Sequence, residues 1–154
     1  MGYDVHRLVQ GRALWLGGVR IPHALGLLGH SDADVLTHAI CDALLGAANM
    51  RDIGYHFPDT SDEFSGIDSK ILLRRVVGLL SDQGYTVGNI DATVCAQQPK
   101  LNSYIPRMQE ALSQAAGILP NQISIKATTT EHLGFVGQEE GISAYAVALI
   151  HTPS

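Results

Sequence analysis

Charged residues are scarce in this sequence. Asp, Glu, Lys and Arg make up only 16% of its 154 residues, whereas roughly 25% is usual in soluble proteins. Because permanent subunit interfaces are depleted in charge, this scarcity favours an oligomer over a monomer with an uncharged surface. The net charge is −5 at pH 7 and the sequence holds no cluster of Lys or Arg, which argues against nucleic acid as a partner.

Cysteines and long apolar runs are also few. The two cysteines, Cys41 and Cys95, lie far apart without C-x-x-C spacing, so we expect free thiols in a reducing compartment and no disulfide framework. No apolar run approaches the ~20 residues of a membrane span, and no basic and then apolar leader is present. These absences predict a protein that neither crosses a membrane nor is secreted.

Several common catalytic motifs are missing. The sequence contains no P-loop, no G-x-G-x-x-G, no G-x-S-x-G and no Cys–His pattern typical of nucleophilic catalysis. If the protein is an enzyme, we therefore expect the nucleophile to belong to the substrate or to be metal-bound water.

The length fits a single domain over residues 1–154. Helices are predicted over residues 31–49, 69–82 and from Pro106 to about 116. Strands are predicted over residues 2–6, 13–21, 85–97, 123–127 and 142–150, and residues 50–68 form a long loop of the kind that usually has a function. The mixed order predicts an α+β fold, with a single mixed β-sheet and helices packed on one face.

Three residues could hold a divalent transition metal. Asp4 and His6 are two positions apart on a predicted strand, so their side chains point the same way. His38, flanked on its helix by Asp34 and Asp42, offers a third ligand that these carboxylates could orient. An Asp–His–His set with an open position is typical of catalytic zinc. The alternative is that these residues bind nothing, since short motifs often match by chance.

Three further segments have polar groups suited to phosphate. Ser31 is predicted to cap the helix through an S-x-x-D box with Asp34, so His30 and Ser31 would lie at a helix N-terminus that attracts anions. The segment 126–131 (KATTTE) offers hydroxyls, N–H groups and a carboxylate for a hard cation. The segment 96–101 (AQQPKL) offers main-chain groups and a lysine. Each also has an ordinary structural explanation: a helix cap, a polar turn and a strand-to-helix connection.

The order of these motifs resembles that of one enzyme family. GYDVHRL, HSDADVLTHAICDALLGA, RDIGYHFPDT, AQQPK and KATTTEHLGF follow one another between residue 2 and about 150, as in the 2-C-methyl-D-erythritol 2,4-cyclodiphosphate synthases. The resemblance implies a phosphorus–oxygen lyase of non-mevalonate isoprenoid (terpenoid) biosynthesis. Such an enzyme converts 4-diphosphocytidyl-2-C-methyl-D-erythritol 2-phosphate to the 2,4-cyclodiphosphate and releases CMP. The substrate's 2-phosphate attacks its own β-phosphate, in agreement with the missing protein nucleophile.

The resemblance also implies roles for individual residues. Zn²⁺ or another divalent transition metal would bind Asp4, His6 and His38 and polarise the β-phosphate. Glu131 would bind a Mg²⁺ or Mn²⁺ that bridges the diphosphate, while His30 and Thr129 would stabilise the transition state. The substrate-binding residues implied are Asp4, His6, His30 and Ser31 around the phosphates; Asp52, Ile53, Gly54, Phe57, Pro58 and Asp59 around methylerythritol; Ala96, Pro99, Lys100, Leu101, Thr128 and Thr129 around cytidine; and Glu131 and Phe135.

The resemblance further implies a homotrimer with active sites between subunits, cytoplasmic in a bacterium or plastid-located if the source is a plant or alga. Gln138 and Ser65 stand where the family commonly has Arg and Lys, and Asp4 lies close to the start of the sequence.

Two other functions would use the same metal-binding and phosphate-binding residues. One is a metal-dependent phosphohydrolase that uses metal-bound water. The other is a non-catalytic trimeric binding module whose structural metal is closed by His56 or His132.

Overall fold

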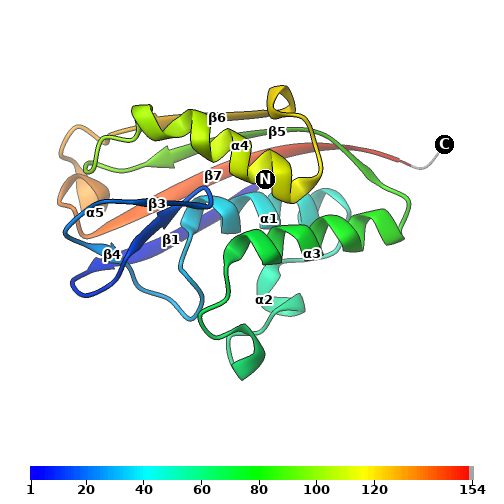
Figure 1. Ribbon diagram of the computed structural model, residues 1–154, viewed down its shortest axis with the longest axis horizontal. Helices are drawn as coiled ribbons and strands as arrows, with labels where there is room; N and C mark the ends of the chain where they lie inside the picture. The colour runs from blue at the N-terminus through cyan, green and yellow to red at the C-terminus, as the bar shows by residue number, and fades with distance from the viewer. Residues whose placement is uncertain (153–154) are drawn as a thin grey trace.

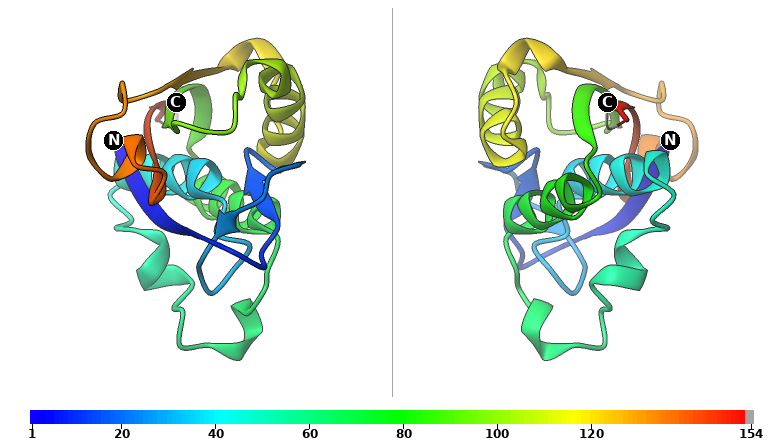
Figure 2. Two further views of the ribbon diagram at one scale, coloured as in Figure 1. Left: turned by 90° about the vertical axis from the view of Figure 1, so that its left-hand side faces the viewer. Right: turned by 90° about the vertical axis from the view of Figure 1, so that its right-hand side faces the viewer.

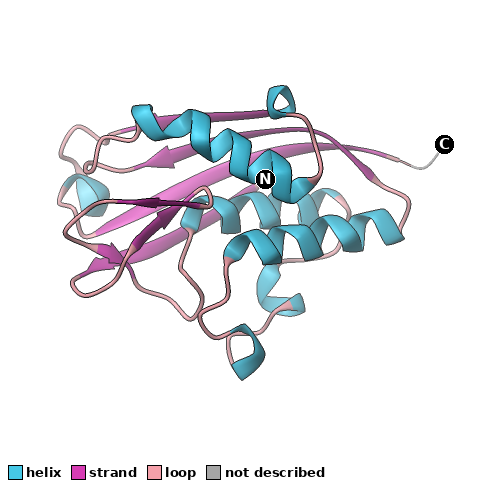
Figure 3. Cartoon of the chain, in the orientation of Figure 1, coloured by secondary structure: helices cyan, strands magenta, loops and turns pink. Residues whose placement is uncertain are grey.

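The computed structural model describes residues 1–152. In this part of the chain a five-stranded sheet, in the order β4-β1-β7-β5-β6, is covered by helices on one face (Figures 1 and 2). Its strands are β1 (Gly2–Val9), β4 (Gly26–Leu27), β5 (Thr86–Cys95), β6 (Ile123–Thr128) and β7 (Gly141–His151). The helices are α1 (Val35–Ala47), α2 (Ile53–His56), α3 (Ser69–Asp82), α4 (Ile105–Ala116) and α5 (Gly134–Gly137), with 3-10 turns η1 (Asp62–Phe64), η2 (Asn102–Tyr104) and η3 (Pro120–Gln122) (Figure 3).

The sheet is mixed, as predicted. β7 is antiparallel to both β1 and β5, whereas β5 is parallel to β6. The parallel pair is connected through α4, which packs on β6, because parallel strands need a crossover connection. The α+β class and the placement of helices on one face are therefore confirmed.

The expectation of one sheet is wrong at residues 13–21. Instead of one strand they form a hairpin of β2 (Leu14–Leu16) and β3 (Val19–Ile21) outside the main sheet. The turn residues Gly17 and Gly18 have φ of 58° and 74°, which glycine adopts without a Cβ penalty. Their N–H groups donate to the carboxylate of Asp34 at 2.9 and 2.7 Å. A distant buried side chain thus stabilises a turn that the apolar pattern did not reveal.

Helices α3 and α4 lie where they were predicted. α3 begins at Ser69, after Asp68 as N-cap, whose carboxylate accepts the Lys70 N–H. Pro106 occupies the first turn of α4, where its missing N–H costs nothing. Gly117 follows the last turn with φ of 68°, the left-handed conformation that ends many helices.

Helix α1 begins later than predicted. Its N-cap is Asp34, whose side chain accepts the Thr37 N–H, so Ser31 lies outside the helix. Ala33 has φ of 57°, which excludes it from a right-handed helix. The expected capping box with Ser31 is therefore wrong. The predicted long loop is also partly helical, since residues 50–68 contain α2 and η1.

Strand β1 packs very closely on α1. A Cβ at Gly2 would overlap the carbonyl oxygen of Ala39 and lie 2.7 Å from the backbone nitrogen of Ala43, so only glycine allows this approach. Asp4 and His6 follow Gly2 at alternate positions and share its face of the strand. The close packing therefore brings their side chains to the surface of α1 that carries His38.

The long helices α1, α3 and α4 all lie on one side of the sheet, and within residues 1–152 its other face has no such cover (Figure 2). Five large side chains of β1 and β7 on this face are 42–57% exposed: Tyr3, Val5, Tyr145, Val147 and Leu149. Within residues 1–152, no helix combines the length and apolar character needed to cross a membrane.

Candidate active site

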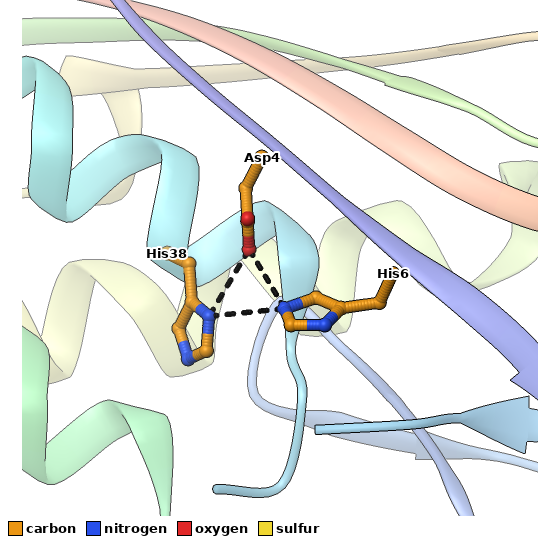
Figure 4. Close-up of side chains that lie close together, drawn as sticks. All are labelled: Asp4, His6 and His38. Atoms are coloured by element: carbon orange, nitrogen blue, oxygen red, sulfur yellow. Dashed lines mark hydrogen bonds and ion pairs between the residues drawn. The ribbon is translucent and has the colours of Figure 1, made fainter. Parts of the chain in front are cut away.

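Asp4, His6 and His38 meet between β1 and α1 (Figure 4). Asp4 Oδ2 lies 2.9 Å from His6 Nε2 and 3.1 Å from His38 Nδ1, and the two ring nitrogens are 3.5 Å apart. The structure thus brings together the three residues that the sequence suggested as metal ligands, although His38 is 34 positions from Asp4.

The geometry of this cluster suits a small divalent cation. Ligand atoms about 2.0–2.1 Å from a tetrahedral metal lie about 3.3 Å from one another, close to the separations found here. One carboxylate and two imidazoles form a donor set suited to Zn²⁺ and similar transition metals. Within residues 1–152, no fourth His, Cys, Asp or Glu completes the cluster. His56 instead contacts the Met50 carbonyl oxygen, at 2.7 Å from Nε2, and His132 is exposed, so neither closes the site as the binding-module alternative required.

The three side chains are electrostatically coupled. Burial raises the pKa of Asp4, but hydrogen bonds to His38 and His6 outweigh this effect and lower its pKa to about 2. Burial lowers the pKa of His38, but the hydrogen bond and the charge of Asp4 outweigh it, so the pKa is raised. In the metal-free protein Asp4 is therefore ionised near neutral pH, and His38 tends to hold a proton that a metal ion must displace.

The orientation of His6 is fixed by a backbone carbonyl. His6 Nδ1 lies 2.9 Å from the Leu28 oxygen, which can only accept a hydrogen bond. Nδ1 must therefore carry a hydrogen, so in the neutral ring that a metal ion requires the lone pair is on Nε2, directed at the cluster.

The expected orienting partners of His38 were wrong. Asp34 is fully buried and accepts hydrogen bonds from Gly17, Gly18 and Thr37. Asp42 accepts the Ile53 N–H at 2.8 Å. Neighbours at i−4 and i+4 on a helix share a face with His38, but these two carboxylates are engaged by other backbone groups. The partner found is Ser69, whose Oγ lies 2.8 Å from His38 Nε2.

A cavity of about 360 Å³ opens next to His6 and His38. Besides His6, six other residues expected to bind substrate line it: His30, Ser31, Ile53, Gly54, Phe57 and Asp59. Asp52 and Pro58 are not among the lining residues; Asp52 caps α2 by accepting the Tyr55 N–H. Phe64, Ile67 and Leu72 form an apolar wall of the cavity. Sequence reasoning missed these residues, because no local pattern links them to the site.

The surroundings of His30 and Ser31 differ from expectation. Ser31 is not in the first turn of α1 as predicted, because Asp34 is the N-cap of that helix. Ser31 Oγ instead accepts the Ala33 N–H at 3.1 Å and lies 3.2 Å from His38 Nε2. His30 Nε2 lies 3.0 Å from the carbonyl oxygen of Ser61, which links this side of the cavity to residues 57–67.

A second cavity, of about 490 Å³, lies at the ends of β5 and β6. It is lined by the whole predicted cytidine pocket, Ala96, Pro99, Lys100, Leu101, Thr128 and Thr129. The cavity is also lined by Gln97 and Gln98, which lie within the AQQPKL segment, and by Asn102 and Ser103, which directly follow it.

Glu131 and Phe135 line neither of these cavities. Glu131 is exposed in a tight turn with φ of 54°, and its N–H donates to Thr129 Oγ1 at 3.2 Å. Phe135 is 42% exposed and packs its ring beside Gly141. Within residues 1–152, Glu131 belongs to no cluster of potential metal ligands.

Comparisons with known proteins agree with this geometry. The family model described as the YgbB family matches residues 1–151. A relative from Bacteroides thetaiotaomicron, a 2-C-methyl-D-erythritol 2,4-cyclodiphosphate synthase, is 68% identical over 149 residues, which cover 97% of this chain and 94% of the relative. A solved synthase of the same name in a CDP-bound form superposes with a TM-score of 0.89 at 34% identity, over 97% of each chain. The bifunctional IspDF of Campylobacter jejuni superposes with a TM-score of 0.93 at 40% identity, over 97% of this chain and 40% of that one.

Proposed function

Because this chain belongs to the YgbB family, and its relatives are 2-C-methyl-D-erythritol 2,4-cyclodiphosphate synthases, we propose that it has this activity. It converts 4-diphosphocytidyl-2-C-methyl-D-erythritol 2-phosphate to the 2,4-cyclodiphosphate and CMP, as a phosphorus–oxygen lyase of non-mevalonate isoprenoid biosynthesis in the cytoplasm. The observation that carries the proposal is the Asp4–His6–His38 cluster, which faces a cavity lined by His30 and Ser31.

The reaction needs positioning more than a protein nucleophile. An oxygen of the 2-phosphate forms a bond to the β-phosphorus, and the bond from that phosphorus to the oxygen of CMP breaks. Holding both groups of one substrate together supplies much of the rate enhancement. The cavity provides polar groups at His30 and Ser31 and apolar side chains at Phe57 and Phe64, which suits a folded methylerythritol chain with two phosphate groups.

Asp4, His6 and His38 would hold Zn²⁺ or another divalent transition metal. When bound, such a cation supplies a Lewis acid that polarises the β-phosphate. Glu131 would hold Mg²⁺ or Mn²⁺ with the diphosphate; a single exposed carboxylate fits this role, since Mg²⁺ is usually bound by one or two carboxylates together with substrate phosphates. His30 and Thr129 would donate hydrogen bonds to oxygens that gain charge in the transition state.

The separation of the two cavities supports a site shared between subunits. Val5, Ser143, Cys95 and Thr128 are in register across the sheet. Thr128 is therefore three strands from Val5, or about 14 Å at roughly 4.8 Å per strand, and the cavities have no lining residue in common. The exposed apolar face of β1 and β7 gives copies of the chain a surface on which to associate. We propose the homotrimer that the family resemblance implies.

Phosphorus NMR of the diphosphocytidyl substrate, incubated with the protein, Zn²⁺ and Mg²⁺, tests the activity. A cyclic diphosphate that appears together with CMP is the expected result. A linear phosphate product would instead identify a hydrolase, and an unchanged substrate spectrum with metal-loaded, folded protein would contradict the proposal.

A further inference from the structure

His38 uses both of its ring nitrogens. Nδ1 faces Asp4 at 3.1 Å, whereas Nε2 points away from the cluster to Ser69 Oγ at 2.8 Å. Ser69 in turn donates its hydroxyl proton to Asp32 Oδ1. The other oxygen of Asp32 accepts the backbone N–H of Ser69 at 2.8 Å. Asp32, Ser69 and His38 therefore form a continuous hydrogen-bonded chain that ends at the candidate metal centre.

The direction of this chain follows from the number of protons. A carboxylate only accepts hydrogen bonds, and a hydroxyl has one proton to give. Because Ser69 gives that proton to Asp32, its oxygen can only accept from His38. Nε2 must therefore carry a hydrogen, and in a neutral ring the lone pair is then on Nδ1. This is the tautomer in which His38 can bind a metal next to Asp4 and His6.

The surroundings of the chain make it rigid. Ser69 is fully buried and His38 is 6% exposed, so water cannot easily replace either partner. Asp32 Oδ1 also accepts the Asp34 N–H at 3.1 Å. Ser31 Oγ lies farther from Nε2, at 3.2 Å against 2.8 Å for Ser69 Oγ, and it also accepts the Ala33 N–H.

We propose that Ser69 and Asp32 are positioning residues of the metal centre, which act through His38 by fixing its tautomer and ring orientation. This inference rests on the proposed metal-binding role of Asp4, His6 and His38. Mutation of a residue that hydrogen-bonds to a metal-binding histidine typically lowers metal affinity by about 10- to 100-fold. The first residue of α3 and the loop before α1 therefore contribute to metal affinity without contacting the metal.

Zinc affinity of the full-length protein, measured by competition with a chromophoric chelator, tests the role. Ser69→Ala and Asp32→Asn are each expected to raise the Kd for Zn²⁺ by about 10- to 100-fold. Ser113→Ala is the matched control, because Ser113 is also a buried helical serine, 3% exposed, but its hydroxyl donates to the Glu110 carbonyl oxygen. Asp68→Asn is the control for Asp32, since it alters the start of α3 without a hydrogen bond to Ser69 Oγ. Neither control should change the Kd.

A spectroscopic measurement separates positioning from a general loss of structure. In the zinc-loaded protein, long-range ¹H–¹⁵N NMR is expected to show a proton on His38 Nε2 that exchanges slowly, and faster exchange in Ser69→Ala. A Kd for Ser69→Ala and Asp32→Asn equal to that of their controls would overturn the inference. If His38→Ala still binds Zn²⁺ like the unaltered protein, the metal assignment itself fails. Loss of binding in His38→Ala with full binding in Ser69→Ala would refute the positioning role alone.

Discussion

Gly2 of β1 lies against the backbone of Ala39 on α1, with no room for a Cβ between them. This contact sets the distance between the strand that carries Asp4 and His6 and the helix that carries His38. Gly2 therefore determines whether the three side chains can converge, even though it is not a ligand.

Gly2→Ala should weaken metal binding. The added methyl group pushes β1 away from α1, so the Kd for Zn²⁺ should rise by at least about tenfold and the free energy of unfolding should fall by about 1–3 kcal/mol, as in other overpacked cores. Gly46→Ala, on α1, is the control, because within residues 1–152 an added Cβ there would have no atom within 4 Å beyond its chain neighbours and the nearby backbone of its own helix. That change should instead stabilise the protein by about 0.5–1 kcal/mol. Equal zinc affinity in Gly2→Ala and the unaltered protein would show that the spacing is not limiting.

The stability of the metal-free protein should depend on pH through His38 and Asp4. The pKa of His38 is raised above 6.5, so its stabilising effect is fully present below pH 6.5 and is lost as the pH rises through the raised value. The pKa of Asp4 is lowered to about 2, so its effect is present above its usual pKa of 3.8 and is lost only as the pH falls towards 2. Urea unfolding with a chelator at pH 5.5 and at pH 8.5 measures this, with Asp4→Asn as the comparison. The unaltered protein should have a higher free energy of unfolding than Asp4→Asn, and this difference should be smaller at pH 8.5 than at pH 5.5. A difference that grows with pH would contradict the coupling between Asp4 and His38.

His38→Ala should remove activity without unfolding the protein. Loss of a bound Lewis acid costs several kcal/mol of transition-state stabilisation, so kcat/KM should fall by on the order of 10³-fold or more. The exposed His151 at the end of β7 provides the control variant His151→Ala, which should retain activity. Product formation by phosphorus NMR and circular dichroism would be compared for both. Activity near that of the unaltered protein would exclude His38 as a metal ligand.

Glu131→Gln should increase the requirement for Mg²⁺. A lost contact to a charged group is worth about 1.5 kcal/mol or more, so the Mg²⁺ concentration that gives half-maximal activity should rise by roughly tenfold. Glu139→Gln serves as control, because Glu139 is likewise exposed and has φ of 59°. An unchanged Mg²⁺ dependence in Glu131→Gln would remove this residue from the proposed role.

A charge on the open sheet face should dissociate the oligomer. Val147 is 49% exposed in the single chain, and Val147→Lys would place an unpaired ammonium group in the proposed interface, where burying it is costly. Sedimentation velocity should then show monomers in place of trimers, with loss of activity because the two cavities would no longer be brought together. Leu119→Lys is the control, at an apolar residue that is 63% exposed next to η3. If Val147→Lys forms trimers as stable as those of Leu119→Lys, the subunit interface lies elsewhere.

The sequence by itself determined the features that local patterns encode. The sequence predicts helices over residues 69–82 and from Pro106 to about 116, and α3 and α4 lie there. The i, i+2 spacing of Asp4 and His6 was enough to place both side chains on one face of β1. The ordered series of motifs was enough to indicate the family that the comparisons then showed.

The tertiary structure decided what depends on contacts between distant residues. Ser69 is the partner of His38 from 31 positions away, and Asp34 stabilises the Gly17–Gly18 turn while it also caps α1. Neither relationship leaves a periodic trace, because each joins single polar groups on separate elements. Spacing in the sequence therefore favours the nearest carboxylates, Asp34 and Asp42, as partners of His38. Packing decides otherwise, since a buried polar side chain bonds to the group that the fold places against it, whatever their separation along the chain.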